Sequence, residues 1–529
     1  MEEFDLRLTE EQGSSSRGSP ETERAKRYAS YIVQHANRAQ HEHLFSGSHF
    51  RGLSDLVSRA TGMVSEPTPF DFVVCCDFGP SNGSDNSIER RLSRFDAASA
   101  GLKSFALLTA PDPLTTRVVF VRGYPSTSWI NVLGSQCRIE IDYFRQKLPF
   151  LENKDYYDLP ALPSNSTNIF HLGINTIYKR QVALTQPQIC SLRGVEKRAV
   201  RDHHRSLKPV GESIVRHVSI IDEANFAIGQ DISIYIATKR GRGRIGRELS
   251  HFDNPAWGVL RKDKRPDPKS DAIPIIRQIP PKMLKSVSPL HSPQSSQASN
   301  YPDLLPPSTS HLAHQYGLTL DHQVASVDLS YALSDLFIFA ACGEAQFLNL
   351  IEQRVSTLLD HSQNQETVVL DELNYVTRLL REHLLRISNI KSFLRTVDYS
   401  DGASRKRSMS VSETHLQPKQ RSPEALQADT VVMDNFNYLS QRAEDLMAQA
   451  KSAIEFSSNR VMLEESRRAI NKADRLERLT LLAFFFLPLS LTTSFFGSNF
   501  RLTMVLCFWD HLSAVAWRNK FQWWYDMWN

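Results

Sequence analysis

Three residues that offer oxygen ligands, Gly497, Ser498 and Asn499, close the longest uncharged run in this chain of 529 residues. They supply backbone carbonyl, hydroxyl and amide oxygens, and none of the three carries a charge. Oxygens of this kind suit a hard divalent cation that keeps its hydration shell, because such a cation sheds water reluctantly. The triplet therefore offers a ligand chemistry that a hydrated divalent cation could use.

The run itself must position the triplet. Residues 479–499 hold no ionised side chain, and a helix that rises about 1.5 Å per residue needs about 20 such residues to cross a hydrocarbon core. Basic residues gather before the run and are sparse after it: Arg467, Arg468, Lys472, Arg475 and Arg478 against Arg501, Arg518 and Lys520. The positive-inside rule then predicts an integral membrane protein with the bulk of its chain in the cytosol.

A proline and four hydroxyl residues mark the second half of the run. Pro488 is followed by Ser490, Thr492, Thr493 and Ser494. Proline removes one backbone hydrogen bond from a helix, and hydroxyl side chains can satisfy the carbonyl that it frees. This pattern favours a helix that lines or faces protein over one surrounded by lipid. If the run borders a pore, these five residues are the candidates that line it.

Composition limits the possible functions. A net charge of +4 is too small to indicate nucleic acid as a partner, and the six cysteines lack CxxC spacing, which indicates reduced thiols. No segment resembles a nucleophile with its base or a P-loop, so we expect neither an enzyme nor a cofactor. The GRGRIG segment at 241–246 fits GxGxxG, but no apolar helical face follows it, and we expect a basic turn there.

Changes in composition divide the rest of the chain. Residues 1–27 are polar and predicted to be disordered, whereas the short apolar runs of residues 28–261 predict an α/β cytosolic domain. Residues 262–312 are rich in Pro and Ser and predict a linker. Residues 313–478 have apolar side chains at steps of three and four and predict a helical stalk, interrupted by a basic disordered loop at 398–429.

The expected fold class is an α+β cytosolic domain followed by long antiparallel or coiled-coil helices that run into a C-terminal transmembrane helix. Helices with a thin apolar stripe need neighbours, so a homo-oligomer is expected. The acidic residues of the last stalk helix form either a solvated face or a regulatory cation site between subunits. They are Asp434, Glu444, Asp445, Glu455, Glu464, Glu465 and Asp474.

Three segments resemble the CorA-type magnesium channel superfamily in its fungal branch. The stretch 467–499 carries RLT, FLPLS and SFFG in the order of that family, and the texts of 118–180 and 344–352 are also similar. The resemblance implies a pentamer in a lipid bilayer, with a stalk helix that becomes the pore-lining first span. It also implies that Mg²⁺ or another divalent cation is the transported ion.

The chain departs from the family pattern at two places. The family closes its first span with Gly-Met-Asn, and here Ser498 stands at the methionine position, which affects ion selectivity most directly. In the aromatic-rich tail 500–529, Asp510 and His511 interrupt the only apolar stretch, and an aspartate near the bilayer centre costs about 2.5–3.5 kcal/mol. We expect the tail to lie at the membrane interface, as a truncated second span or as the end of a single-span relative.

The sequence leaves three functional interpretations open. The first is a membrane channel or transporter for divalent cations, with the triplet 497–499 as its selectivity element. The alternative is a non-conducting, single-span, membrane-anchored coiled-coil protein whose α/β domain binds a partner. The third is a soluble protein that buries 479–496 in its own interior.

Overall fold

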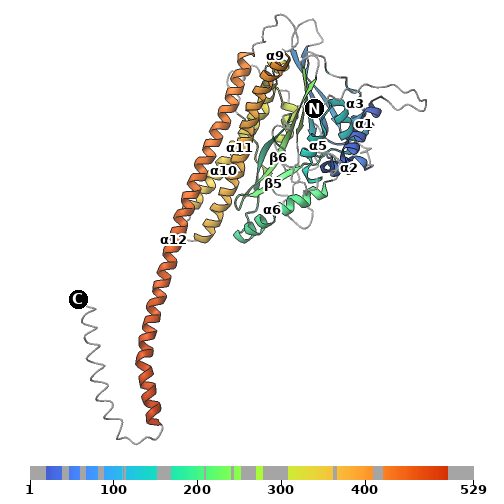
Figure 1. Cartoon of the computed structure of the whole chain (residues 1–529). Helices are drawn as coiled ribbons and strands as arrows, with labels where there is room; N and C mark the ends of the chain where they lie inside the picture. Colours follow the sequence, from blue (N-terminus) through green and yellow to red (C-terminus); the bar gives the residue numbers. More distant parts are fainter. Residues whose placement is uncertain are drawn as a thin grey trace. The chain divides into compact units, whose positions relative to one another are not determined.

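The computed structural model describes most of the chain between Pro20 and Gly497 (Figure 1). The described residues are 20–38, 47–59, 67–80, 88–109, 111, 115–151, 162, 168–207, 210–239, 244–251, 270–277, 308–360, 366–408 and 421–497. The chain divides into two compact units. Unit 1 comprises Met1–Gln363 and Asp371–Ser452, and unit 2 comprises Asn364–Leu370 and Ala453–Asn529.

Unit 1 is built on a twisted sheet with the strand order β2-β1-β3-β7-β6-β4-β8, to which β5 adds by pairing with β6. The pair β3–β7 is parallel, and the other described pairs are antiparallel. The strands are β1 (Asp71–Pro80), β2 (Ile88–Asp96), β3 (Thr116–Arg122), β4 (Ile169–Arg180), β5 (Val215–Ile220), β6 (Asn225–Lys239), β7 (Arg244–His251) and β8 (Ser270–Ala272).

Both faces of the sheet are covered by helices, which explains why most positions of β1 are buried. Val74 and Cys76 belong to one hydrophobic core, and Cys75 belongs to another. Successive side chains of a strand point to opposite faces, so the adjacent thiols Cys75 and Cys76 lie on opposite sides of the sheet. This placement confirms that the two cysteines do not pair with each other.

Five short helices build the core on the Cys75 side of the sheet. They are α1 (Pro20–Ala36), α2 (Arg51–Ser58), α3 (Ser99–Ala106), α4 (Thr127–Cys137) and α5 (Ile141–Lys147). Trp129, Ile130 and Leu133 stand at helical spacing and form the buried face of α4. Ser126 caps α4, because its hydroxyl accepts a hydrogen bond from the Trp129 backbone N–H at 3.4 Å.

The other helices of unit 1, three of them long, cover the opposite face of the sheet. They are α6 (Gln186–Ser206), α8 (Thr309–Gln315), α9 (His322–Val327), α10 (Leu329–Asp360), α11 (Glu366–Ser408) and the beginning of α12 (Pro423–Gly497). The predicted apolar steps are confirmed, since Leu373, Val376, Leu380 and Ile387 of α11 are buried. In α12 the same holds for Phe436, Leu439, Ala443, Leu446 and Ala450. Coiled-coil packing of these helices stays a prediction.

Two of the predicted unstructured segments contain regular structure. Helix α1 begins at Pro20, so only residues 1–19 of the predicted disordered N-terminus lie outside the described residues. Within the predicted linker 262–312, β8 pairs with β4 and Ile275 joins the large core. The reason is that Ala272 and Ile275 bury against the rest of unit 1 beside the β4 edge, and a count of Pro and Ser does not register such partners.

The predicted basic loop 398–429 is shorter than expected. Helix α11 continues to Ser408, and α12 begins at Pro423 behind a Ser422 cap that accepts the N–H of Ala425 at 3.1 Å. Arg421 is not part of a flexible loop, because it pairs with Asp328 at 2.8 Å and with Asp429 at 2.7 Å. Residues 409–420 lie outside the described residues.

The GxGxxG segment also differs from its prediction. Residues from Arg244 onward form strand β7, which pairs with β3 and β6, and no turn or helix begins there. A dinucleotide site of this type needs a helix N-terminus directly after the glycines. The strand therefore supports the rejection of a dinucleotide site, although not the predicted turn.

Truncation of the α11 core face should weaken unit 1. Leu380 is fully buried, and Leu380→Ala should lower the free energy of unfolding by about 2–5 kcal/mol through lost burial and the remaining cavity. Urea unfolding, followed by hydrogen exchange of the α11 amides, measures the loss. The control is Leu385→Ala on the same helix: this side chain is 63% exposed, and its loss should change stability by less than about 0.5 kcal/mol. Equal losses in both variants would contradict the described packing of α11.

Candidate functional site

The predicted membrane span lies at the end of α12. This helix continues without a break through Pro488 to Gly497. Among the described residues it is the one helix long and apolar enough to cross a membrane. Gly497 of the predicted selectivity triplet is the last residue of the helix, whereas Ser498 and Asn499 lie outside the described residues.

Large apolar side chains surround this end of the helix on every side. Phe484, Phe485, Phe486 and Leu487 are consecutive, so they point in four directions, and each is about 60% exposed or more. None of the apolar window is buried inside unit 2 or elsewhere in the described chain. The interpretation that this run packs in the interior of a soluble protein is therefore wrong for the residues the structure describes.

The hydroxyl groups of the span bond to the backbone of their own helix. Thr492 donates to the Leu489 carbonyl at 2.8 Å, and Thr493 donates to the Leu489 and Ser490 carbonyls at 2.9 and 3.0 Å. Because Pro488 lacks an N–H, the carbonyl that loses its helical donor is that of Phe484. The hydroxyl groups therefore bond to the Leu489 and Ser490 carbonyls, which lie more than one turn after the Phe484 carbonyl that Pro488 leaves without a donor. Each hydroxyl oxygen still keeps lone pairs that can accept hydrogen bonds from water.

The helix separates the five predicted pore residues onto two sides. Ser490 and Ser494 are four residues apart and share a face, and Gly497 follows three residues later on the same face. Thr493 borders this face. Pro488 and Thr492 are each two residues from Ser490 and lie on the opposite side of the helix. That all five residues line a pore stays a prediction.

The face of Ser490 and Ser494 continues toward the N-terminus as an uncharged stripe. Its positions alternate steps of four and three residues through a region where most other side chains are ionised. We call it the neutral stripe, and it comprises Met462, Ser466, Ala469, Ala473, Leu476, Thr480, Ala483, Leu487, Ser490, Ser494 and Gly497. Sequence analysis missed this feature because it followed apolar residues alone, whereas the stripe mixes apolar residues with Ser, Thr and Gly.

The acidic residues of α12 lie on its exposed sides. Asp434, Glu444 and Asp445 are exposed, and Glu464 pairs with Arg468 at 3.7 Å one turn away. Within the described part of the chain, no three His, Cys, Asp or Glu side chains come together as metal ligands. The contacts fit a solvated face, and a regulatory cation site between subunits stays a prediction.

A buried polar network, which sequence analysis also missed, fixes α11 to the sheet in unit 1. Arg386 donates to His217 Nδ1 at 3.3 Å, His217 Nε2 lies 3.0 Å from the Asn175 side-chain oxygen, and Asn175 donates to Glu344 at 3.1 Å. On the far side, His383 donates to the same carboxylate. The other guanidinium nitrogen of Arg386 lies 3.1 Å from His217 Nε2, so this arginine contacts both ring nitrogens.

Burial and neighbouring charged groups shift the pKa values of His217 and Glu344 in this network. Burial, together with the neighbouring Arg386 and His383, lowers the pKa of His217 well below the usual value of 6.5. Burial alone would raise the pKa of Glu344, but His383, Arg386 and the Asn175 hydrogen bond outweigh it and lower this pKa. The backbone leaves room for the imidazole at Gly229, where an added Cβ would lie 1.5 Å from the His217 ring.

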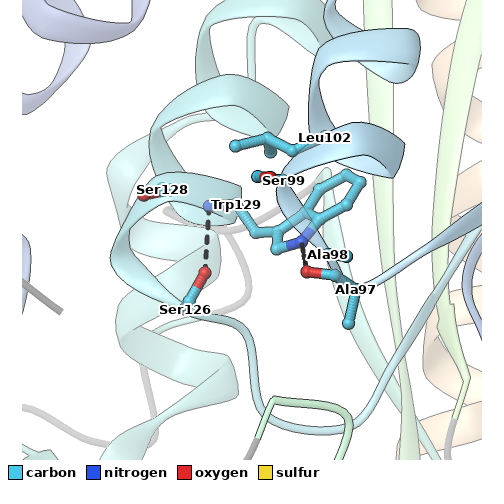
Figure 2. A pocket seen from close by; sticks show the side chains of 7 residues that line it. All are labelled: Ala97, Ala98, Ser99, Leu102, Ser126, Ser128 and Trp129. Atoms are coloured by element: carbon cyan, nitrogen blue, oxygen red, sulfur yellow. Dashed lines mark hydrogen bonds between the residues drawn. The ribbon is translucent and has the colours of Figure 1, made fainter. Parts of the chain in front are cut away.

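A small hollow lies beside Trp129 in unit 1 (Figure 2). It lies between the first turns of α3 and α4, and it is lined by Ala97, Ala98, Ser99, Leu102, Ser126, Ser128 and Trp129. The indole N–H of Trp129 donates to the Ala97 carbonyl at 3.2 Å. No charged side chain lines the hollow, and we assign it no chemistry.

Comparison with known families places the end of α12 in context. Residues 345–524 match the family model described as CorA-like Mg²⁺ transporter protein. Over these residues, the chain is similar to the CorA-like Mg²⁺ transporter family. The match begins within α10 and continues beyond Gly497, so it contains the whole candidate site. No curated protein matches the sequence. The family consists of transporters, which agrees with the expectation of a membrane protein for ion transport that is not an enzyme.

Unit 1 should lose stability in acid because of His217. The unfolded chain binds a proton on this histidine below about pH 6.5, whereas the folded protein resists it, so acid favours unfolding. The loss should reach about 1.4 kcal/mol per pH unit for this one group. Hydrogen exchange of β4 and α11 in urea, between about pH 5 and 8, measures the slope.

The variant His217→Gln should show a shallower slope than the wild type. Some slope should remain, because burial also lowers the pKa of His171 to about 4. Identical slopes in the variant and the wild type would show that His217 does not titrate differently in the folded protein.

A charge in the apolar end of α12 should impair membrane insertion. Phe485→Asp places a carboxylate within the run and should cost about 2.5–3.5 kcal/mol of insertion free energy. The measurement is the fraction of protein that resists alkaline extraction from membranes. The control is Leu426→Asp, on an exposed position of the same helix in unit 1. Normal integration of Phe485→Asp would exclude this run as the span.

Proposed function

We propose that copies of this chain surround a pore for Mg²⁺-type divalent cations, with the neutral stripe of α12 facing the axis. The observation that carries this proposal is the absence of charge from the stripe where charge is dense around it. Between residues 464 and 478 the stripe holds Ser466, Ala469, Ala473 and Leu476. The ionised residues of the same stretch all lie off it: Glu464, Glu465, Arg467, Arg468, Lys472, Asp474, Arg475, Glu477 and Arg478.

A neutral lining of small side chains suits a hydrated divalent ion. Mg²⁺ is small, prefers octahedral oxygen coordination and gives up its water slowly, so it passes most easily where its hydration shell fits. Ala473 and Ala483 leave space, and the Ser490 and Ser494 hydroxyls can accept hydrogen bonds from the water of the shell. Charged side chains on this face would either repel the ion or hold it too tightly to conduct.

The selectivity element in this proposal is the triplet Gly497, Ser498 and Asn499. A ring of Asn499 amide oxygens, with Gly497 carbonyls beneath it, would hold the ion through its water at the external mouth. Ser498 replaces the methionine of the family signature and adds a ring of hydroxyls. We infer that this ring changes the choice among divalent cations rather than the ability to conduct.

The proposed orientation places unit 1 in the cytosol. The support is the exposed basic cluster directly before the apolar run, which includes Arg475 and Arg478. A pentameric assembly is proposed from the resemblance to the CorA-type channels. The tail 500–529, including Asp510, is proposed to lie at the membrane interface.

The flux of Mg²⁺ into proteoliposomes that contain a fluorescent Mg²⁺ indicator tests the function. Asn499→Ala should abolish the flux, because it removes the amide ring without adding charge. Thr492→Ala serves as the control, since this residue lies across the helix from the stripe and its loss should leave the flux near that of the wild type. Comparable flux in both variants would refute the proposed role of Asn499.

The same experiment separates the channel from its alternative. A wild-type protein that inserts and assembles but carries no divalent cation would be a non-conducting, membrane-anchored coiled-coil protein. In that case the channel proposal fails, and unit 1 would be the functional part of the molecule.

A further inference from the structure

We infer that α6 covers the outer edge of β5 in place of a neighbouring strand, and that Glu372 and Tyr375 of α11 hold it there. The role of α6 is then to keep this edge from pairing with another chain. All of these elements belong to unit 1, where α6 lies against β5 (Figure 1). The inference is independent of the proposed channel, because the family match does not include the sheet.

The outer edge of β5 has no neighbouring strand among the strands that the structure describes. β5 pairs with β6 along its other edge. An open edge offers backbone N–H and C=O groups to any extended segment that reaches it, and natural sheets cover such edges to avoid association. Something other than a strand must therefore satisfy these groups.

The ladder with β6 shows which backbone groups of β5 face outward. Ile221 donates its N–H to the Asn225 carbonyl in the hairpin at 3.1 Å. Successive residues of a strand direct these groups to opposite edges, so those of Ile220 face outward. Between Val215 and His217, two residues of β5 advance against one of β6, which marks a β-bulge. The extra residue places Val215 on the same edge as Ile220.

Two histidines in the last turn of α6 satisfy the beginning of this edge. His204 donates through Nε2 to the Val215 carbonyl at 2.6 Å. His203 donates through Nε2 to the carbonyl of Ser213, two residues earlier, at 2.9 Å. Because a carbonyl can only accept, both imidazoles must carry a proton on Nε2. The two rings thus supply donors where a paired strand would supply backbone N–H groups.

Two further side chains of α6 satisfy the other end of the edge. Glu196 accepts the Ile220 N–H at 2.9 Å. Arg193 donates to the Ile220 and Ile221 carbonyls at 2.9 and 3.0 Å. Ile220 is fully buried, so leaving its N–H and C=O groups unpaired would be costly. At this end α6 supplies both the acceptor and the donor that a strand would offer.

The same two side chains of α6 are held by α11. Arg193 donates to both carboxylate oxygens of Glu372, and its guanidinium lies 3.8 Å from the centre of the Tyr375 ring. Tyr375 donates its hydroxyl to Glu196 at 2.7 Å. Glu372 also accepts from Arg354 of α10 at 2.8 Å, and its side chain is only 2% exposed. A buried carboxylate shared by two arginines is strongly fixed, so α11 positions the residues that cover the edge.

Hydrogen exchange of single amides in the full-length protein tests the cover. Glu196→Val removes the acceptor, so the Ile220 amide should exchange about tenfold faster than in the wild type. The Ile221 amide is the internal control, because its acceptor is Asn225 and not a residue of α6. Glu196→Gln keeps an acceptor oxygen and should keep the Ile220 amide protected.

The contribution of α11 is tested by the same two amides. Glu372→Gln keeps the shape of the side chain but removes its charge, so Arg193 is held less firmly. The Ile220 amide should then exchange several-fold faster, with the Ile221 amide unchanged. The control is Arg205→Ala, which removes an exposed cation of the same helix and should change neither amide.

An uncovered edge should also pair with the edge of a second copy. His203→Leu combined with His204→Leu removes both donors, whereas the two substitutions to Gln keep an N–H at each position. Light scattering in detergent should show a several-fold rise in particles larger than the wild-type protein for the leucine pair. The glutamine pair should match the wild type.

Three results would overturn the inference. The first is wild-type exchange of the Ile220 amide in Glu196→Val or in Glu372→Gln. The second is an equal gain in exchange at the Ile220 and Ile221 amides, which would indicate general loosening of β5. The third is equal scattering from the leucine and glutamine pairs, and this comparison decides if Glu196→Val does not fold.

Discussion

The structure depends on one exposed apolar surface, the end of α12, where large side chains point outward in every direction. The side chains from Phe484 to Leu487 are largely exposed, and none of the apolar window is buried in the described chain. Apolar area of this extent is unfavourable in water, which agrees with a span that crosses a membrane. Such a span accounts for the basic cluster that precedes the run.

The different sides of α12 carry different kinds of residue. The neutral stripe leaves space and hydrogen-bond acceptors for water, an exposed ridge of Phe456, Leu463 and Ile470 supplies apolar area, and charges occupy the other sides. A helix with 3.6 residues per turn keeps these sides apart over many turns only if the sequence repeats near every seven residues. The seven-residue repeat of the neutral stripe continues from the charged part of α12 into its apolar end.

In unit 1, α10 and α11 pack against a sheet, and polar groups are buried between the helices and the strands. Glu344 is the acceptor at which hydrogen bonds from Asn175 and His383 converge. A buried carboxylate is costly unless it is fully paired, so the network specifies one position of α11 on the sheet. The family match begins within α10 and does not include the sheet, which leaves the ligand or partner of unit 1 open to experiment.

The sequence by itself determined the elements whose signal is local. The uncharged run, its basic flank and the periodic burial of Leu373, Val376 and Leu380 follow from composition and from steps of three and four residues. Strand β1 and helix α4 were predictable for the same reason. Boundaries were less so: the Pro/Ser-rich linker and the basic loop were predicted too long, because β8 and the Arg421 ion pairs depend on partners far away in the chain.

Only the tertiary structure decided which residues act together. His217, Glu344 and His383 are distant in sequence and carry no motif, so their hydrogen-bond network could be found only after the sheet and α11 were in place. The helix also separated Ser490 and Ser494 from Pro488 and Thr492, which the sequence had grouped as neighbours. The physical reason is that adjacency along a chain differs from adjacency on a helix surface, and only the fold sets the second.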